Sequence, residues 1–483
     1  MLTTKQKEAY DMKQKRYKTN LILIALLAAA VVFSVSGCGN EQSSASQTAT
    51  PDSAQTTTVQ ATTAAARSQK LAEGDITVKD TIVNGDDGGH AITTDGESAD
   101  YSNTLVSKTG DSNSGDEADF YGDNSAIFAT NGGTLNLSDM VVKTDGTHAN
   151  AVFSYGEGTT VNISDSYINT TGNCSGGLMT TGGGTMNAEN LTIETSGNSS
   201  AAIRSDRGGG TVNVTGGSYT TGGKGSPVIY SIADITVSDA EMVSTASQGV
   251  VVEGKNSVTL NNVDLTADNN TKNSDKSEWY QAVMIYQSMS GDAAEGQSSF
   301  TMNGGNLTNA NGDVFFVNNT ATTISLTNAN ITNNDENGLF LRAAAAGWGN
   351  EGSNGGQVTL NAKQQTINGD MLVDEVSHLN LYLSDKSVFN GAINSSAQAG
   401  EVYVDLSGGA KWTLSGDSYI TSLSCDADSI DLNGHKLYVN GKEYTSGTSS
   451  QGEAIEVVST GGNGGGAPGD GGTPPEKPDG KKD

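Results

Sequence analysis

Acidic and basic side chains are the first candidates for chemistry in this chain. The sequence holds 55 Asp and Glu residues, 26 Lys and Arg residues and 4 His residues. Enzymes that cleave glycosidic bonds commonly use two carboxyl groups held a fixed distance apart, one of them acting as an acid. Most acids here stand beside Gly, Asn and Ser in segments typical of turns, where Asp is favoured for conformational reasons. The sequence indicates no particular carboxylate pair, and we predict that the chain is not an enzyme.

Aromatic and guanidinium side chains form a second group of candidates, suited to binding. Trp279, Tyr280 and Trp348 lie in long segments rich in polar residues and Gly, and an aromatic ring in a surface loop suits the apolar face of a sugar. Other members of the group recur at intervals along the chain. The candidate ligand-binding residues are Phe128, Phe153, Arg204, Tyr230, Phe316, Trp279, Tyr280 and Trp348.

An internal repeat must position these residues. The segment SAIFATNGGTLNLSDMVVKTDG (125–146) is followed by NAVFSYGEGTTVNISDSYINTTG (150–172), and undecorated copies recur every 22 to 26 residues. Each copy has three short apolar runs separated by Gly, Asn, Asp or Ser, which indicates short strands and turns with positive φ. Three strands per turn, stacked in parallel, describe a right-handed parallel β-helix. We therefore predict an all-β solenoid of about 12 coils over residues 74–445.

The first strand of each coil carries two neighbouring apolar columns. We assign the inward column to Ile127, Val152, Leu178, Ile203, Ile229, Val251, Met284, Phe315, Phe340 and Leu372. The outward column is then Phe128, Phe153, Met179, Arg204, Tyr230, Val252, Ile285, Phe316, Leu341 and Val373. An exposed apolar strip of this length is typical of a binding surface, unless an insertion covers it or both columns point inward.

The second strand alternates strictly, so its faces are easier to assign. Apolar pairs such as Leu135 and Leu137 should point inward, with one polar residue between them pointing outward. Stacking the coils about 4.8 Å apart would align the outward residues in a hydrogen-bonding ladder. Its members are Asn136, Asn162, Asn187, Asn213, Thr236, Thr259, Thr301, Ser325 and Thr359.

Insertions and caps complete the predicted solenoid. The repeat stretches to 33, 31 and 32 residues after Val251, Met284 and Phe340, which places the three loop aromatics in insertions. Residues 429–444 carry two Asn-Gly pairs between alternating strands and predict a hairpin cap at the C-terminal end. Residues 74–124 are irregular and should hold the N-terminal cap with one or two imperfect coils.

The repeat resembles the pectin-lyase-like superfamily and the adhesin-like β-helices of bacterial surface proteins. Polygalacturonases of that superfamily carry Asn-Thr-Asp, Asp-Asp, Gly-His-Gly and Arg-Ile-Lys elements in this order. Here Thr144-Asp145-Gly146 precedes His148, but Lys143 replaces the Asn and no Arg-Ile-Lys is present. The arginines after residue 67 are dispersed, so the basic residue of the lyases has no clear counterpart. The resemblance implies architecture without a catalytic motif.

The N-terminal 37 residues have the composition of a secretory signal. Six basic residues precede an uncharged run, residues 21–35, which is shorter than the roughly 20 residues that span a bilayer comfortably. Val35-Ser36-Gly37-Cys38 resembles a lipobox. This resemblance implies cleavage before Cys38 and lipidation of its thiol, which would hold the protein on the outer face of a bacterial membrane, in a Gram-positive organism by our interpretation.

The remaining segments and charges agree with an extracytoplasmic location. Residues 38–73 are rich in Ser and Thr and predict a flexible tether, and residues 446–483 predict a disordered Gly/Pro tail. The net charge is −29, and removal of a leader with six positive and two negative charges would make it −33, which disfavours nucleic acid as a partner.

The other two cysteines, Cys174 and Cys425, should remain unpaired. They would lie about nine coils apart, or about 43 Å at the strand spacing, whereas a disulfide needs Cα atoms within about 7 Å. No Cys/His cluster has zinc-ligand spacing, so we predict neither a metal site nor a cofactor. The acidic stretch from residue 86 to residue 123 is compatible with calcium, but it lacks EF-hand spacing, and a solvated acidic cap is the preferred interpretation.

These observations favour a non-catalytic, membrane-anchored β-helix that binds a glycan or another surface polymer through strand one and the inserted loops. A polysaccharide lyase or glycoside hydrolase with a diverged site is one alternative. A purely structural stalk or spacer is another.

Overall fold

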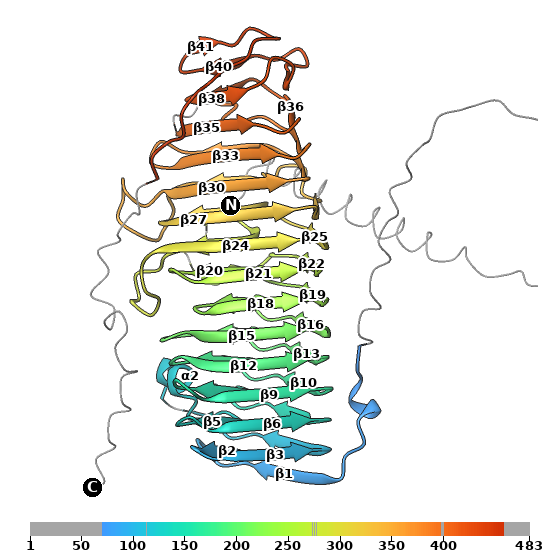
Figure 1. Cartoon of the computed structure of the whole chain (residues 1–483). Coiled ribbons are helices and arrows are strands. Elements are labelled where there is room, and N and C mark those ends of the chain that lie inside the picture. Colours follow the sequence, from blue (N-terminus) through green and yellow to red (C-terminus); the bar gives the residue numbers. More distant parts are fainter. Residues whose placement is uncertain are drawn as a thin grey trace, which may run out of the picture. The chain divides into compact units, whose positions relative to one another are not determined.

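The computed structural model describes residues 70–457, except 113, 273, 275, 277, 398 and 399. These residues form the predicted right-handed parallel β-helix, in which three walls of stacked strands enclose one core (Figure 1). The longest wall has 13 strands, close to the predicted 12 coils. The predicted leader, Cys38 and nearly all of the tether lie outside the described residues, as does the tail after residue 457.

The strand-one sheet contains the first strand of each coil. Its strands, in spatial order, are β2 (Ile92–Asp95), β5 (Ile127–Thr130), β8 (Val152–Tyr155), β11 (Leu178–Thr181), β14 (Ile203–Ser205), β17 (Ile229–Ser231), β20 (Val250–Glu253), β23 (Gln281–Tyr286), β26 (Asp313–Asn318), β29 (Leu341–Ala343) and β32 (Met371–Val373).

The strand-two sheet runs the whole length of the described solenoid. It consists of β3 (Ser98–Ser102), β6 (Thr134–Ser138), β9 (Thr160–Ser164), β12 (Gly184–Glu189), β15 (Gly210–Thr215), β18 (Asp234–Ser238), β21 (Ser257–Asn261), β24 (Gln297–Asn303), β27 (Thr320–Thr327), β30 (Gly356–Lys363), β33 (His378–Ser384), β35 (Glu401–Leu406) and β38 (Ser422–Cys425).

The strand-three sheet forms the third wall, and a second sheet of four strands follows it. The first sheet consists of β1 (Asp80–Asn84), β4 (Thr104–Lys108), β7 (Val141–Thr144), β10 (Tyr167–Thr170), β13 (Thr192–Thr195), β16 (Ser218–Thr221), β19 (Glu241–Ser244), β22 (Asp264–Ala267), β25 (Asn306–Asn309) and β28 (Asn330–Asn333). The second consists of β31 (Thr366–Asn368), β34 (Val388–Asn390), β36 (Lys411–Thr413) and β39 (Ile430–Asp431).

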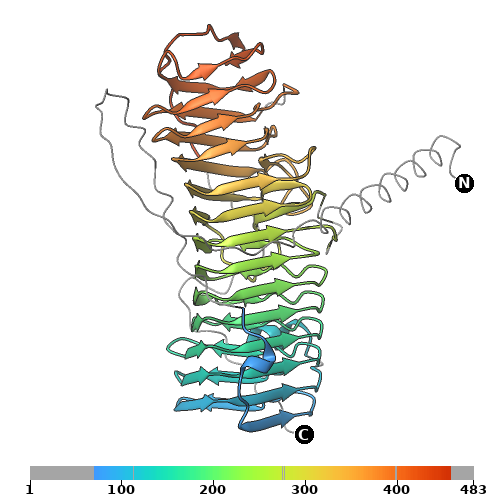
Figure 2. The same cartoon turned by 90° about the vertical axis from the view of Figure 1, so that its right-hand side faces the viewer.

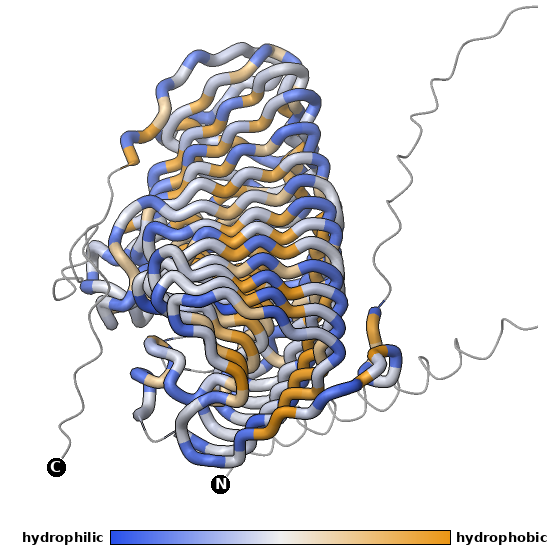
Figure 3. Tube along the Cα trace, turned by 60° about the horizontal axis from the view of Figure 1, so that its bottom comes forward, coloured by the Kyte–Doolittle hydropathy of each residue, from blue (hydrophilic) through white to orange (hydrophobic). Residues whose placement is uncertain are grey.

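The core follows the alternation seen in strand two. Leu135 is 0% exposed and Leu137 3%, while Asn136 between them faces outward. Hydrophobic positions of successive coils line up along the walls (Figure 3). Aromatic rings also contact one another in the core, where the ring centre of Phe315 lies 5.5 Å from those of Phe300 (edge-on) and Phe340 (tilted). The burial of these columns supplies the main driving force for a fold whose coils have few contacts other than with their neighbours.

The turn between strands two and three shows why Asn, Asp and Gly are so frequent. Asp139, Asp165 and Asn190 occupy the same place in three successive coils, with φ of 52°, 46° and 53°, and Gly216 and Asp239 follow in the next two coils with φ of 70° and 56°. Asn and Asp tolerate this left-handed conformation better than other residues with a side chain. Stacking adds a hydrogen bond from the Nδ2 of Asn190 to Asp165, at 2.6 Å.

The C-terminal cap agrees with the sequence in part. The second Asn-Gly pair closes a hairpin between β40 (Leu437–Val439) and β41 (Lys442–Glu443), with φ of 47° and 72° at Asn440 and Gly441. β37 (Ser418–Ile420) pairs with β40 on its other edge. The first Asn-Gly pair closes no hairpin, because β39 before it still pairs in parallel with β36 as part of the solenoid.

Both ends of the described chain fold back over the solenoid. Leu71 donates its amide to Thr192 on β13, beside an ion pair of Lys70 with Glu194. The chain then passes outside the coils through the short 3-10 helix η1 (Glu73–Asp75) to β1 (Figure 2). At the other end Ile455 exchanges two hydrogen bonds of 2.9 Å with the side chain of Asn380 on β33.

The N-terminal region is more regular than its sequence indicates. Residues 80–108 form β1 to β4, and irregular structure is concentrated in an insertion that carries α2 (Asp116–Tyr121). Lys108, the single lysine of the acidic stretch, is fully buried and donates to the carbonyl oxygen of Asp86 at 2.6 Å. The pKa of Lys108 is lowered by burial, against the attraction of Asp87, Asp86 and Asp111. An internal ammonium group thus offsets part of the acidic charge of this segment.

The two cysteines of the solenoid are both free, which confirms that they form no disulfide. No helix in the described part of the chain is long and apolar enough to cross a membrane.

Candidate functional site

The outward column of the strand-one sheet differs from the sequence assignment in four coils. Strand pairing aligns Phe128, Phe153, Met179, Arg204, Tyr230, Val251, Met284, Phe316, Arg342 and Leu372. The assignment of Val251, Met284 and Leu372 as inward and of Val252, Ile285, Leu341 and Val373 as outward is therefore wrong. Phe340 is buried, but it precedes the aligned inward residue Leu341.

The physical reason for this slip is that several apolar residues follow one another in these strands, as in GVVVEG and AVMIYQ. Period-two alternation fixes a register only where one face is polar. The pairing of Phe315 inward and Phe316 outward was assigned correctly.

The outward column is also covered, which is one of the alternatives that the sequence left open beside an exposed strip. Phe128 is 9% exposed, Phe153 0% and Phe316 2%. The insertion that carries α2 covers the first two residues: Tyr121 contacts Tyr155 edge-on at 5.9 Å, and a Cβ at Gly122 would lie 2.6 Å from the Phe128 ring. The inserted segments are polar in composition, yet they cover an apolar column.

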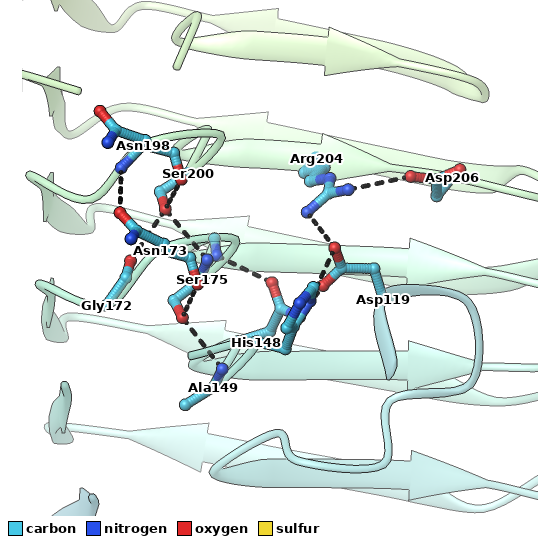
Figure 4. A network of polar contacts seen from close by, with 12 residues as sticks. Asp119, His148, Ala149, Gly172, Asn173, Ser175, Asn198, Ser200, Arg204 and Asp206 are labelled. Atoms are coloured by element: carbon cyan, nitrogen blue, oxygen red, sulfur yellow. Dashed lines mark hydrogen bonds and ion pairs between the residues drawn. The ribbon is translucent and has the colours of Figure 1, made fainter. Parts of the chain in front are cut away.

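Arg204 is held in a buried ion network between the two halves of this column. Its guanidinium donates to Asp119 on α2 and to Asp206, each at 3.0 Å (Figure 4). Burial alone would lower the pKa of Arg204, but Asp119 and Asp206 outweigh it and raise that pKa. Burial raises the pKa of Asp206 to about 6, although Arg204 opposes this. Arg204 is therefore engaged within the protein and is not a free ligand-binding group.

A pocket of about 490 Å³ opens over the upper half of the column. We call it the aromatic pocket. It is lined by Gly225, Pro227, Tyr230, Gln248, Val251, Ser274, Lys276, Met284, Tyr286, Ser288, Met289, Ser290 and Trp348. Its volume lies within the range of roughly 300–1,000 Å³ typical of small-ligand sites. All three predicted insertions contribute to its wall.

The rings of the aromatic pocket are fixed from behind by one buried carboxylate. Glu253 is 1% exposed and accepts hydrogen bonds from the hydroxyl groups of Tyr230 and Tyr286, the latter at 2.8 Å. Trp348 contacts Tyr286 edge-on, with ring centres 5.1 Å apart. The pKa of each phenol is raised well above its ordinary value by burial and by the charge of Glu253. Both phenols therefore keep the protons that they donate, and the site is arranged before any ligand arrives.

Trp279 and Tyr280 do not line the aromatic pocket. Trp279 packs on Phe316 at 5.4 Å, and the guanidinium of Arg342 lies 4.5 Å above its ring. Lys272 lies 5.3 Å from the ring centre of Tyr280. The contacts of Trp279 hold the insertion after β22 against the solenoid, and the contact of Lys272 with Tyr280 lies within the insertion.

Of the eight predicted residues, the structure brings Tyr230 and Trp348 together in the aromatic pocket. Phe128 and Phe153 belong to the lower, covered half of the column, at least three coils from Tyr230. Sequence reasoning missed Glu253 and Tyr286. Their signal was faint: an acid and a tyrosine at the ends of consecutive copies of strand one, GVVVEG and AVMIYQ.

The outer face of the strand-two sheet is different in character. Amide groups donate from each coil to the preceding one: Asn136 to Asp100 at 2.7 Å, Asn162 to Asn136 at 2.8 Å, Asn187 to Asn162 at 2.9 Å and Asn213 to Asn187 at 3.0 Å. Strand pairing aligns the predicted outward residues from Asn136 to Ser325, which confirms this part of the column. The last predicted member is wrong, because Asn361, not Thr359, aligns with Ser325. An open groove of about 670 Å³ follows the ladder. Its amides already have partners within the protein.

Comparisons with known proteins find no match: no family model, no curated protein and no solved structure matches the chain.

Proposed function

We propose that this protein is a lipid-anchored, extracytoplasmic β-helix that binds a glycan or another surface polymer in the aromatic pocket. The observation that carries the proposal is the pair Tyr230 and Trp348, gathered in one pocket whose rings are positioned by Glu253 and Tyr286.

The chemistry of the wall favours a sugar over a purely apolar ligand. Tyr230, Tyr286 and Trp348 present ring surface, and Met284 and Val251 extend it. Polar groups from Gln248 and from several serines share the same wall and suit hydroxyl groups at the edge of a sugar ring. The strong negative charge of the chain disfavours polyanionic polymers, so we propose a neutral or weakly charged glycan.

Attachment to a membrane rests on the sequence before the described residues. The lipobox-like Val35-Ser36-Gly37-Cys38 supports acylation of Cys38, and the polar segment that follows would act as a tether. Mass spectrometry of the N-terminus of protein purified from membranes tests this part by itself. We expect a diacylglyceryl group on Cys38, whereas an intact, unmodified leader would contradict the anchor.

A glycan array tests binding, and variants place it. We expect Trp348→Ala and Tyr230→Ala to lose retention of whichever glycan binds the native protein. Tyr382→Ala is the matched control, because Tyr382 lies on the strand-two sheet against Tyr403, away from the aromatic pocket. Circular dichroism should show the same β-sheet content for all three variants.

The outcomes separate the proposal from its alternatives. Retention that survives both pocket variants would remove the aromatic pocket as the site. No retention of any glycan or cell-wall polymer would favour a stalk. New reducing ends or unsaturated products after incubation with uronates and mixed polysaccharides would show an enzyme instead.

A further inference from the structure

A second cluster of reactive side chains lies below the aromatic pocket. It joins Asp119 on α2, His148 in the turn between β7 and β8, and Cys174 in the turn between β10 and β11. One ligand atom from each residue lies within 4.8 Å of the others. A carboxylate, an imidazole and a thiol are the three side-chain groups that proteins use most to bind zinc.

The solenoid explains how residues so far apart in sequence meet. His148 and Cys174 occupy the same place in consecutive coils, each in the left-handed conformation, with φ of 56° and 55°. The backbone amide of His148 donates to Asn173, beside Cys174, at 2.9 Å, which locks the two turns in register. The next coils hold Ser199 and Gly225 at this place, with φ of 55° and 64°. The pairing of an imidazole with a thiol is thus specific to two coils.

The insertion that carries α2 delivers the third group. Thr181 on β11 donates its hydroxyl to the carbonyl oxygen of Phe120, at 2.7 Å, and the guanidinium of Arg207 lies 3.9 Å from the Phe120 ring centre. These contacts seat α2 on the solenoid so that Asp119 points towards His148 and Arg204 (Figure 4). Asp119 is 3% exposed, so its carboxylate is nearly out of reach of bulk water.

The hydrogen bonds at Asp119 leave room for an ion. Oδ1 accepts from Asn150 at 3.1 Å and Oδ2 accepts from Arg204 at 3.0 Å. An ionised carboxylate has about four acceptor positions, and metal-binding carboxylates are commonly oriented by such outer hydrogen bonds.

His148 is already in contact with the carboxylate. It is 8% exposed, and its Nδ1 lies 3.2 Å from Oδ2 of Asp119 (Figure 4). Imidazole nitrogen and carboxylate oxygen both serve as zinc ligands, so an ion bound here would coordinate two groups that the fold has brought together.

The charge of the cluster is compatible with a cation. Asp119 and Asp206 carry two negative charges, and Arg204 between them carries one positive charge. Arg207 is paired with Asp292 at 2.6 Å and adds no net charge. With a thiolate at Cys174 the cluster would hold an excess of two negative charges, which one divalent ion would neutralise.

We propose that Asp119, His148 and Cys174 bind one divalent transition-metal ion, with Zn²⁺ the best fit. Arg204 and Asn150 act as positioning residues that orient Asp119. Zinc ligands lie about 2.0–2.3 Å from the ion, and hence about 3.5 Å from each other, so the three side chains need to close by about an ångström. The ion would pin α2 to the solenoid and keep one coordination position for water. This site does not depend on glycan binding in the aromatic pocket.

Cobalt titration of the chelator-treated, reduced full chain tests the proposal. We expect one metal ion per chain by native mass spectrometry and a thiolate-to-cobalt charge-transfer absorption. Cys174→Ser should lose that absorption and weaken binding by at least tenfold. Ser199 already occupies the corresponding place of the next coil, so this variant should fold normally.

Two further variants decide the outcome. Cys425→Ser, which removes the buried cysteine at the other end of the solenoid, should bind as the native protein does. His148→Asn keeps a residue that tolerates the left-handed conformation and should also lose cobalt. Absence of the charge-transfer absorption in the native protein, or its persistence in Cys174→Ser, would overturn the proposal.

Discussion

The two outer faces of the solenoid that are formed by strands one and two differ in polarity and in how far they are covered. The strand-two face is polar, lies open to solvent and stacks its amides in a ladder that needs no cover. The strand-one face is apolar through most coils, and three insertions together with α2 cover it. Burying an apolar column on the outside of the coils is favourable, so inserted segments of the chain pack over it. Where the cover is incomplete, an aromatic pocket remains. The decoration therefore creates the candidate site, and the bare repeat does not.

The largest effect that tests this contrast is expected at Phe153. Because Phe153 is buried as completely as a core residue, Phe153→Ala should lower the free energy of unfolding by about 3–5 kcal/mol, as for other buried phenylalanines. Chemical denaturation followed by circular dichroism would measure the loss. A change below about 0.5 kcal/mol, typical of a surface position, would show that the column is open after all.

A smaller, pH-dependent effect is expected from the buried network beneath the same cover. The pKa of Asp206 is about 6 in the folded protein, above its ordinary value of 3.8, so the folded state holds a proton that the unfolded state releases. This contribution is fully present below about pH 4 and is lost as pH rises through about 6. Relative to Asp206→Asn, the native protein should lose on the order of 2 kcal/mol over this interval. Parallel stability curves for the two proteins would show that Asp206 has an ordinary pKa.

The smallest effect should come from the polar face. Asn162→Ala removes one donor and one acceptor from the ladder, between Asn136 and Asn187. Since water can replace both bonds at an exposed position, the loss in unfolding free energy should be about 0.5–1.5 kcal/mol. Thermal unfolding of this variant and of Thr236→Ala, on the same column, would measure it. A loss as large as that of Phe153→Ala would erase the distinction between the two faces.

The sequence predicts the solenoid well because each coil repeats the same period-two alternation in strand two and the same turn residues. It fails where alternation is absent. In GVVVEG and AVMIYQ several apolar residues follow one another, so the inward and outward columns exchange without any visible change in pattern. The sequence also left undecided whether an insertion covers Phe128 and Phe153, because the inserted segments are polar in composition.

The residues of the two candidate sites were likewise predictable from the sequence only in part. Trp348 and Tyr230 were identifiable as aromatic residues outside the expected core, but the carboxylate that positions them is a buried Glu253 at the end of a strand. Asp119, His148 and Cys174 are separated by 29 and 26 residues, which matches no metal motif. The second interval is one coil, so His148 and Cys174 could have been paired from the repeat, whereas Asp119 required the fold of the α2 insertion.

The central claim is that ligand binds on the decorated strand-one face and not along the open amide ladder. The crystal structure of the protein with the glycan that it retains best would test this most directly. We expect a sugar ring against Trp348 and Tyr230, with its hydroxyl groups near Gln248 and the serines of the pocket wall. A glycan lying instead along Asn136, Asn162 and Asn187, with the aromatic pocket unchanged, would contradict the account.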